Sequence, residues 1–305
     1  MKALILGCLG QDGSYLAEQL VDAGHEVWGM IRPRSYSRLG WIAPLVADQR
    51  MSLIEGDLLD QASLEKALQH IDPDEVYNLA AVTAPGAAWG YPQPPLLADV
   101  TAMGVLHLLE AMRLRAPSAR LVHASSSAIY DPGRYGLYGA AKLFAHELVV
   151  GYRSGVGLHA SNAVLFSHTS PRQSPTFLAR AITETVARIA AGLAEQLILS
   201  NVDNRRDWGY APDYTRALAL MAEQQVPGDY VITTGRRHSV RELVEVALAA
   251  AGLDWTAVKV TNMPAQPAEV WKSANHTRFE LGWEPHTTFE EMIQLMVAAD
   301  VEALS

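Results

Sequence analysis

The chain has 305 residues, enough for one large domain or two small ones, and 49% of them are hydrophobic, as in a globular protein with a sizeable core. Its formal net charge of −9 argues against a nucleic-acid-binding protein, because such proteins carry basic patches. A single cysteine, Cys8, excludes an intrachain disulfide, and we expect no apolar run long enough to span a bilayer. These features predict a cytoplasmic protein without nucleic-acid or membrane partners.

Short apolar runs alternate with longer helical patterns through the first half of the chain. The predicted strands are Lys2–Leu6, Glu26–Ile31, Met51–Glu55, Glu75–Asn78, Arg120–Ala124 and Leu158–Leu165. The predicted helices between them are Ser14–Ala23, Gln61–Gln69, Gly104–Arg115 and Gly139–Arg153. This alternation predicts an α/β fold with a doubly wound parallel sheet and helices on both faces.

The alternation of predicted strands and helices becomes less regular after Phe166, where we expect a loop, Ser167–Ser174. Three further helices and two strands are predicted at Pro175–Gly192, Pro212–Gln224, Val240–Ala251, Gln196–Leu199 and Asp229–Thr233. We therefore expect two domains, residues 1–166 and residues 167–305. The second is a smaller C-terminal α/β lobe, from which some strands and helices return to the first.

A glycine-rich turn follows the first predicted strand directly and opens the first helix. Glycines let the chain turn tightly and let its backbone approach a pyrophosphate, and the helix N-terminus adds N–H groups and partial positive charge. The strand–turn–helix context predicts a nicotinamide dinucleotide site. Its predicted residues are Gly7, Gly10, Gln11, Asp12 and Gly13.

The ends of the next three strands complete this cofactor site. An acidic residue after the second strand would bind the ribose 2′-hydroxyl of NAD, but Arg32 and Arg34 stand there and suit the 2′-phosphate of NADP. Alternatively, these arginines belong to a solvated basic loop that binds no phosphate, in which case the cofactor could be NAD. Asp57 and Leu58 are placed to contact the adenine, and Ala80 to line the cofactor groove.

Tyr138 and Lys142 are four residues apart on a predicted helix and therefore share one face. A free tyrosine titrates near pH ~10, and a neighbouring ammonium should lower its pKa so that it can serve as a base. Ser126, at the end of the fifth strand, is placed to orient a substrate oxygen. The histidines show no metal-ligand spacing, so we predict no metal.

These features together resemble the extended short-chain dehydrogenase/reductase family, and within it the GDP-mannose 4,6-dehydratases. The resemblance covers nearly the whole chain and implies a Rossmann domain that binds NAD(P), a sugar-nucleotide-binding lobe, and homodimers or homotetramers. The stretches that carry it are Gly7–Leu16, Tyr77–Ala81, Asn162–Arg172, Arg206–Gly209, Ser239–Glu242, Pro267–Val270 and Leu281–Pro285.

The resemblance also implies the substrate, a nucleotide-diphosphate sugar, with a GDP-linked sugar favoured. Arg206 would hold its diphosphate. The residues implied to bind it are Thr83, Ser126, Ser167, His168, Arg180, Arg206 and Glu269.

One departure falls where the dehydratases concentrate their chemistry. They carry a glutamate that takes the C5 proton, and this chain has Ala128 there. The stretch Ser125–Ala128 is instead similar to the S-S-S-A segment of UDP-galactose 4-epimerases. We therefore interpret the chain as a 4-epimerase that oxidises C4 transiently. A 4-ketoreductase, a 4,6-dehydratase with a relocated base, and a non-catalytic sugar-nucleotide sensor are the alternatives.

Overall fold

The computed structural model describes residues 1–83, 93–261, 277 and 280–304. Its contacts divide the chain into two compact units, each with its own core. Unit 1 comprises Met1–Leu165 and Tyr214–Ile232 with the described residues of Asn275–Trp283. Unit 2 comprises Phe166–Asp213 with the described residues of Thr233–Ala274 and Glu284–Ser305. The binding roles assigned to the two predicted domains stay predictions.

Unit 1 is built on a seven-stranded sheet in the order β11-β6-β5-β4-β1-β2-β3, in which every neighbouring pair is parallel. The strand order reverses between β1 and β4, and sheets of this kind bind ligands at the carboxyl ends of the strands at such a point. The strands are β1 Lys2–Leu6, β2 Glu26–Ile31, β3 Met51–Glu55, β4 Glu75–Asn78, β5 Arg120–Ser126, β6 Ala160–Leu165 and β11 Asp229–Ile232.

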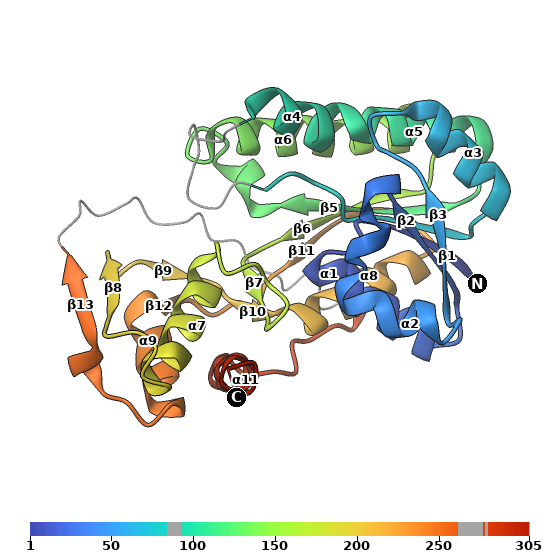
Figure 1. The fold of residues 1–305 in the computed structure, drawn as a ribbon. Helices are drawn as coiled ribbons and strands as arrows, with labels where there is room; N and C mark the ends of the chain where they lie inside the picture. Colours follow the sequence, from blue (N-terminus) through green and yellow to red (C-terminus); the bar gives the residue numbers. More distant parts are fainter. Residues whose placement is uncertain (84–92, 262–276, 278–279, 305) are drawn as a thin grey trace. The chain divides into compact units, whose positions relative to one another are not determined.

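Helices cover both faces of this sheet, which confirms the predicted doubly wound α/β fold (Figure 1). One apolar cluster joins the sheet to α1, α2 and α8, and a second joins the opposite face to α3, α5 and α6. The α-helices of this unit are α1 Gln11–Asp22, α2 Ala43–Ala47, α3 Gln61–Ile71, α4 Pro94–Ala98, α5 Gly104–Arg115, α6 Gly136–Gly151 and α8 Ala211–Glu223. Its short 3-10 and π turns are η1 Pro33–Arg38, η2 Gly40–Ile42, η3 Asp99–Met103, η4 Ser127–Tyr130 and η5 Tyr152–Val156.

One helical stretch, Pro94–Arg115, is long and apolar enough by length and composition to cross a membrane. Half of its apolar window is buried inside the structure, where α5 packs against α3 and α6. The expectation that the chain contains no apolar stretch of this length is therefore corrected. Its apolar side chains serve the core on one face of the sheet.

Unit 2 holds three two-stranded sheets, β7–β10, β9–β12 and β8–β13, and an apolar core between α7, α9 and α11. Two of its helices begin with capping boxes, Ser239 with Glu242 and Thr288 with Glu291, which satisfy the first backbone N–H groups. The elements are β7 His168–Thr169, α7 Leu178–Ala190, β8 Leu197–Ser200, β9 Arg205–Arg206, β10 Gly209–Tyr210, β12 His238–Ser239, α9 Val240–Ala250, η6 Trp255–Ala257, β13 Val258–Thr261 and α11 Phe289–Glu302.

Most predicted segments differ from the structure by a few residues, and the following differences are the most informative. The expected loop after Phe166 contains the short strand β7, which exists because it pairs with β10, a distant partner that local sequence does not reveal. Helix α7 begins at Leu178 rather than Pro175, because Phe177 is extended and acts as its N-cap. Helix α6 begins at Gly136, three residues before the predicted start.

Candidate active site

The glycine-rich turn between β1 and α1 has no room for larger side chains at two positions. Gly7 is left-handed with φ +86°, and a Cβ there would lie 2.8 Å from the backbone nitrogen of Ala80. A Cβ at Gly13 would lie 2.2 Å from the carbonyl oxygen of Gly7. Glycine at these positions lets α1 start directly against the ends of β1 and β4. This close cradle fits the pyrophosphate of a dinucleotide.

The first turn of α1 faces the same place. Its N-cap is Gly10, and among the described residues no side chain caps the helix there. Gln11 Nε2 donates a hydrogen bond to Asp12 Oδ1 at 2.9 Å, so these two predicted cofactor residues are linked to each other. The positive end of the helix dipole therefore points at the cradle, as an anion site requires.

The predicted adenine and ribose residues lie at the neighbouring strand ends. Arg32 and Arg34 follow β2 and are exposed, and within the described part of the chain neither pairs with a carboxylate. Asp57 accepts a hydrogen bond from the N–H of Leu59 at 3.0 Å, which holds the turn after β3. Leu58 is buried in the same turn. The structure thus brings a basic strand end and a fixed turn to one edge of the cofactor cradle.

The three predicted catalytic residues meet where β5 ends against α6. Lys142 Nζ donates a hydrogen bond to the carbonyl oxygen of Ala124 at 2.7 Å and lies 5.9 Å from the centre of the Tyr138 ring. Tyr138 also shares a hydrogen bond with the Ser126 side chain. Ser126 accepts a hydrogen bond from the N–H of Ala128 at 3.2 Å, so its hydroxyl proton can point at the Tyr138 oxygen.

Burial dominates the electrostatics of this pair. It raises the pKa of Tyr138, while the hydrogen bond with Ser126 lowers that pKa and the Asp12 carboxylate raises it further. Burial also lowers the pKa of Lys142 to about 8, against the opposing field of Asp12. In the protein alone the net shift in the pKa of Tyr138 is therefore upward, opposite to the lowering that was expected. The lysine is engaged with Ala124, and the desolvation of Tyr138 is the larger effect.

Two of the predicted substrate residues help to form the β7–β10 region of unit 2. The carbonyl oxygen of Ser167 accepts a hydrogen bond from the N–H of Gly209 at 3.0 Å. His168 Nδ1 lies 2.7 Å from the carbonyl oxygen of Phe166, so it must carry a proton. Thr83, in unit 1, is exposed, and Glu269 lies outside the described residues.

The two predicted substrate arginines have different surroundings within unit 2. Arg180 forms an ion pair with Asp300, whose side chain is 2% exposed, so its charge stabilises a buried carboxylate. No carboxylate pairs with Arg206 in the part of the chain that the structure describes. Its neighbour Asp207 instead accepts hydrogen bonds from residues 233–235. The Arg206 guanidinium could therefore bind an anion, whereas the Arg180 guanidinium is already paired with Asp300.

A polar contact beside the predicted catalytic residues was missed by the sequence reasoning. His146 Nδ1 lies 3.0 Å from Ser125 Oγ, and both side chains are buried. The signal that could have revealed it is spacing, since His146 follows Lys142 by four residues on the same helix.

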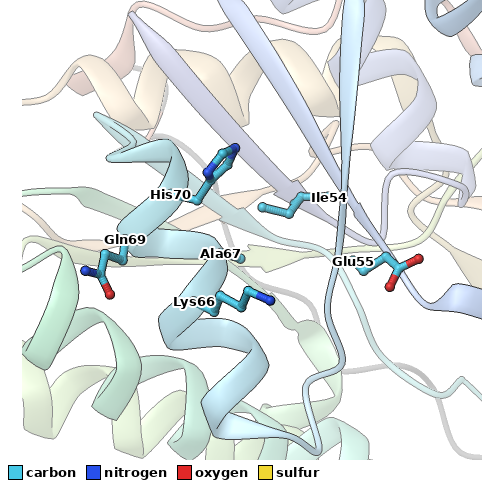
Figure 2. Close-up of a pocket in the computed structure, with 6 residues that line it drawn as sticks. All are labelled: Ile54, Glu55, Lys66, Ala67, Gln69 and His70. Carbon is cyan, nitrogen blue, oxygen red and sulfur yellow. The ribbon is translucent and has the colours of Figure 1, made fainter.

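A hollow of about 500 Å³ opens between α3 and the edge strand β3 (Figure 2). None of the predicted site residues lines it, so it lies apart from the cofactor cradle. No group of three or more potential metal ligands occurs among the residues that the structure describes. The lining residues are Ile54, Glu55, Lys66, Ala67, Gln69 and His70.

Comparison with known proteins agrees with this geometry. Residues 4–296 match the family profile of GDP-mannose 4,6 dehydratase. GDP-mannose 4,6 dehydratase 1 of Arabidopsis thaliana is 37% identical over 98% of this chain and 90% of its own length.

Solved structures share the fold at lower identity. The dTDP-glucose 4,6-dehydratase DesIV of Streptomyces venezuelae, bound to NAD, has a TM-score of 0.86 with this chain at 22% identity. The match covers 99% of this chain and 97% of DesIV. The UDP-glucose 4-epimerase of Thermotoga maritima, bound to UDP-glucose, has a TM-score of 0.84 at 22% identity, and each chain is covered completely (100%). The chain therefore belongs to the GDP-mannose 4,6-dehydratase family, within the extended short-chain dehydrogenases/reductases.

Proposed function

We propose that this protein is a nicotinamide-dependent sugar-nucleotide 4-epimerase that oxidises and re-reduces C4. One observation carries the proposal. Ser126, Tyr138 and Lys142 are assembled for proton exchange at one oxygen, while Ala128, where the resemblance places the base for C5, is buried and has no group that carries a proton. General acid–base catalysis typically contributes ~10²–10⁴ in rate. The lack of a base for C5 would therefore suppress dehydration, whereas oxidation and reduction at C4 would not be affected.

The residues that would hold the cofactor are those of the glycine cradle, with Lys142 near its ribose. Bound there, a nicotinamide dinucleotide supplies the acceptor and later the donor of a hydride. When the C4 alcohol is oxidised, the Tyr138 oxygen would accept its hydroxyl proton, and Tyr138 would return that proton when the C4 ketone is reduced. For epimerisation the sugar would present its opposite face to the cofactor before the reduction.

Three side chains share the work of this proton transfer. Ser126 donates a hydrogen bond to the Tyr138 oxygen, and this bond opposes the effect of burial on the pKa of Tyr138. When protonated, Lys142 places positive charge 5.9 Å from the Tyr138 ring and favours the phenolate. The same arrangement lets Ser126 hold the substrate oxygen once the sugar enters.

We further propose NADP as the cofactor and a GDP-linked sugar as the substrate. Exposed Arg32 and Arg34 follow β2 without carboxylate partners among the described residues, as a 2′-phosphate site requires. Arg206 likewise keeps its charge for a diphosphate. The GDP assignment is supported by the family relatives, whose names specify GDP-mannose.

Dehydration is the second candidate, favoured by the same relatives, which are named GDP-mannose 4,6-dehydratases. It requires a base other than residue 128. Asp12 is the carboxylate whose charge reaches both Tyr138 and Lys142, and it is the residue to examine first if dehydration is found.

The test starts with mass spectrometry of the purified protein for retained cofactor and sugar nucleotide, followed by assays on GDP-sugars. An epimerase yields the 4-epimer without added cofactor. Stoichiometric use of NADPH on a 4-keto sugar would identify a ketoreductase, and release of a 4-keto-6-deoxy sugar from GDP-mannose would identify a dehydratase. Either result overturns the proposal.

A matched pair of variants ties the activity to the site. Tyr138→Phe should lower turnover by about 10²–10⁴, the usual contribution of an acid–base residue. Tyr152→Phe is the control, because its hydroxyl bonds Glu110 at the far end of the same helical segment. Equal turnover of the wild type and Tyr138→Phe would indicate a non-catalytic sugar-nucleotide sensor.

A further inference from the structure

Helix α6 carries a third buried polar residue in line with its catalytic pair. Tyr138, Lys142 and His146 are spaced four residues apart, so they share one side of the helix. His146 is 8% exposed and Lys142 is 4% exposed. No step of the proposed mechanism uses this histidine, yet the fold retains it next to the catalytic pair, where an unpaired polar group would be costly.

The three side chains contact three consecutive residues at the end of β5. Lys142 binds the carbonyl of Ala124, His146 Nδ1 lies 3.0 Å from Ser125 Oγ, and Tyr138 shares a hydrogen bond with Ser126. Each strand residue is thus held by one residue of the helix.

This end of β5 needs such support because one neighbouring strand stops short of it. Among the described residues, β4 pairs with β5 only as far as Asn78 and His123, whereas β6 continues beside β5 to Ser126. The last three residues of β5 therefore have a strand on one side only, and the side chains of α6 supply contacts of another kind.

The far side of the His146 ring determines which nitrogen carries the proton. Nε2 lies 3.6 Å from Asp229 Oδ2 on β11. Arg153 donates two hydrogen bonds to Asp229, at 2.9 and 3.1 Å, and Asn162 donates a third at 3.0 Å. A carboxylate held in this position favours a proton on Nε2, so Nδ1 accepts a hydrogen bond from the hydroxyl of Ser125. Burial lowers the pKa of His146, which keeps the imidazole neutral as this bond requires.

We propose that His146 is a positioning residue for the catalytic site: by holding Ser125 it fixes the end of β5, so that the hydroxyl of Ser126 stays on the oxygen of Tyr138. This inference rests on the proposed function, because it takes Ser126 and Tyr138 as the catalytic groups. Asp229 acts one step further back, since it orients the His146 ring.

The test compares His146→Phe, which removes the acceptor, with His146→Asn, whose side-chain oxygen can replace Nδ1. His146→Phe should lower kcat about tenfold, the value of one hydrogen bond, with KM for the sugar nucleotide unchanged. It should also raise the apparent pKa of the basic group in the profile of rate against pH, and Ser126→Ala should raise it in the same direction. His146→Asn should restore most of both. A merely structural role for His146 predicts no such change in the pH profile.

His159→Phe is the matched control. This histidine precedes β6 and bonds the carbonyl oxygen of Gln224 at 3.0 Å, near the end of the sheet opposite to the catalytic residues. Its loss should leave kcat and the pH profile unchanged. Wild-type values for His146→Phe, or equal losses in both histidine variants, would overturn the inference.

A second measurement needs no substrate, so it separates this inference from the proposed function. In protein labelled with carbon-13 at tyrosine Cζ, the Tyr138 signal, assigned by its absence in Tyr138→Phe, reports the hydrogen bond with Ser126. His146→Phe should shift that signal in the direction that Ser126→Ala does. If His146→Phe does not fold, Ser125→Ala removes the same bond and should give the same shift. An unmoved signal would refute the inference even in an inactive protein.

Discussion

Replacing Gly13 by alanine should damage the cofactor site through the backbone alone. The new Cβ would lie 2.2 Å from the carbonyl oxygen of Gly7 and 2.6 Å from the Cα of Cys8. Both are backbone atoms, so no flexible side chain can move aside. Overpacking of this kind costs about 1–3 kcal/mol. The turn must open, which moves the first turn of α1 away from the pyrophosphate. Loss of one charge-assisted hydrogen bond, about 1.5–3 kcal/mol, would weaken cofactor binding roughly 10- to 150-fold.

Two other glycines make this a graded experiment. A Cβ at Gly10 would meet the Gly7 oxygen at 3.3 Å, so Gly10→Ala should have a smaller effect. Gly151, at the end of α6, has nothing within 4 Å of such an atom, and Gly151→Ala should stabilise the helix by up to about 1 kcal/mol. Urea unfolding and calorimetric titration with NADP and NAD would measure both effects. Unchanged unfolding and affinity in Gly13→Ala would refute the reasoning.

Three further predictions concern charge. Burial lowers the pKa of Lys142 to about 8, so between about pH 8 and 10 the unfolded chain binds more protons than the folded protein. Urea unfolding should therefore show that the free energy of unfolding of the wild type rises over this pH range relative to that of Lys142→Met. Arg180→Met should lower the free energy of unfolding by about 3–5 kcal/mol, since it leaves the buried Asp300 carboxylate without its cation, whereas removing an exposed pair by Arg113→Met should cost at most about 1 kcal/mol. Arg34→Ala should weaken NADP binding about tenfold or more in titration calorimetry and leave NAD binding unchanged, with Arg50→Ala as the exposed control; equal effects on both cofactors would contradict a 2′-phosphate site.

Much of unit 1 follows from local pattern. Ala3–Leu6 are apolar, the glycines after them match a tight turn, and these features alone predict β1 and the cradle. The catalytic pair is predictable in the same way, because helical spacing places Tyr138 and Lys142 on one face. The sequence could not show that desolvation would raise the pKa of Tyr138, since burial depends on packing from distant segments.

The rest of the site depends on contacts between residues far apart in the chain. The ion pair of Arg180 joins residues 120 positions apart in sequence order, 180 and 300, and no local pattern indicates it. Strand β7 is two residues long and exists through its pairing with β10. His146 shows both cases, because its spacing on α6 is visible in the sequence, whereas its contacts with Ser125 and Asp229 require the folded sheet.

The position of Ala128 explains how a member of this family could catalyse a reaction other than dehydration. In the proposed mechanism, the features shared with the family, the glycine cradle and the tyrosine helix, serve cofactor binding and proton exchange at C4. The N–H of residue 128 supports them through its bond to Ser126, and any non-proline residue provides that N–H. Under the proposed function, the side chain at this position separates elimination from oxidation and reduction at C4. An alanine there keeps the backbone contribution and carries no proton, so dehydration would require a base elsewhere in the site.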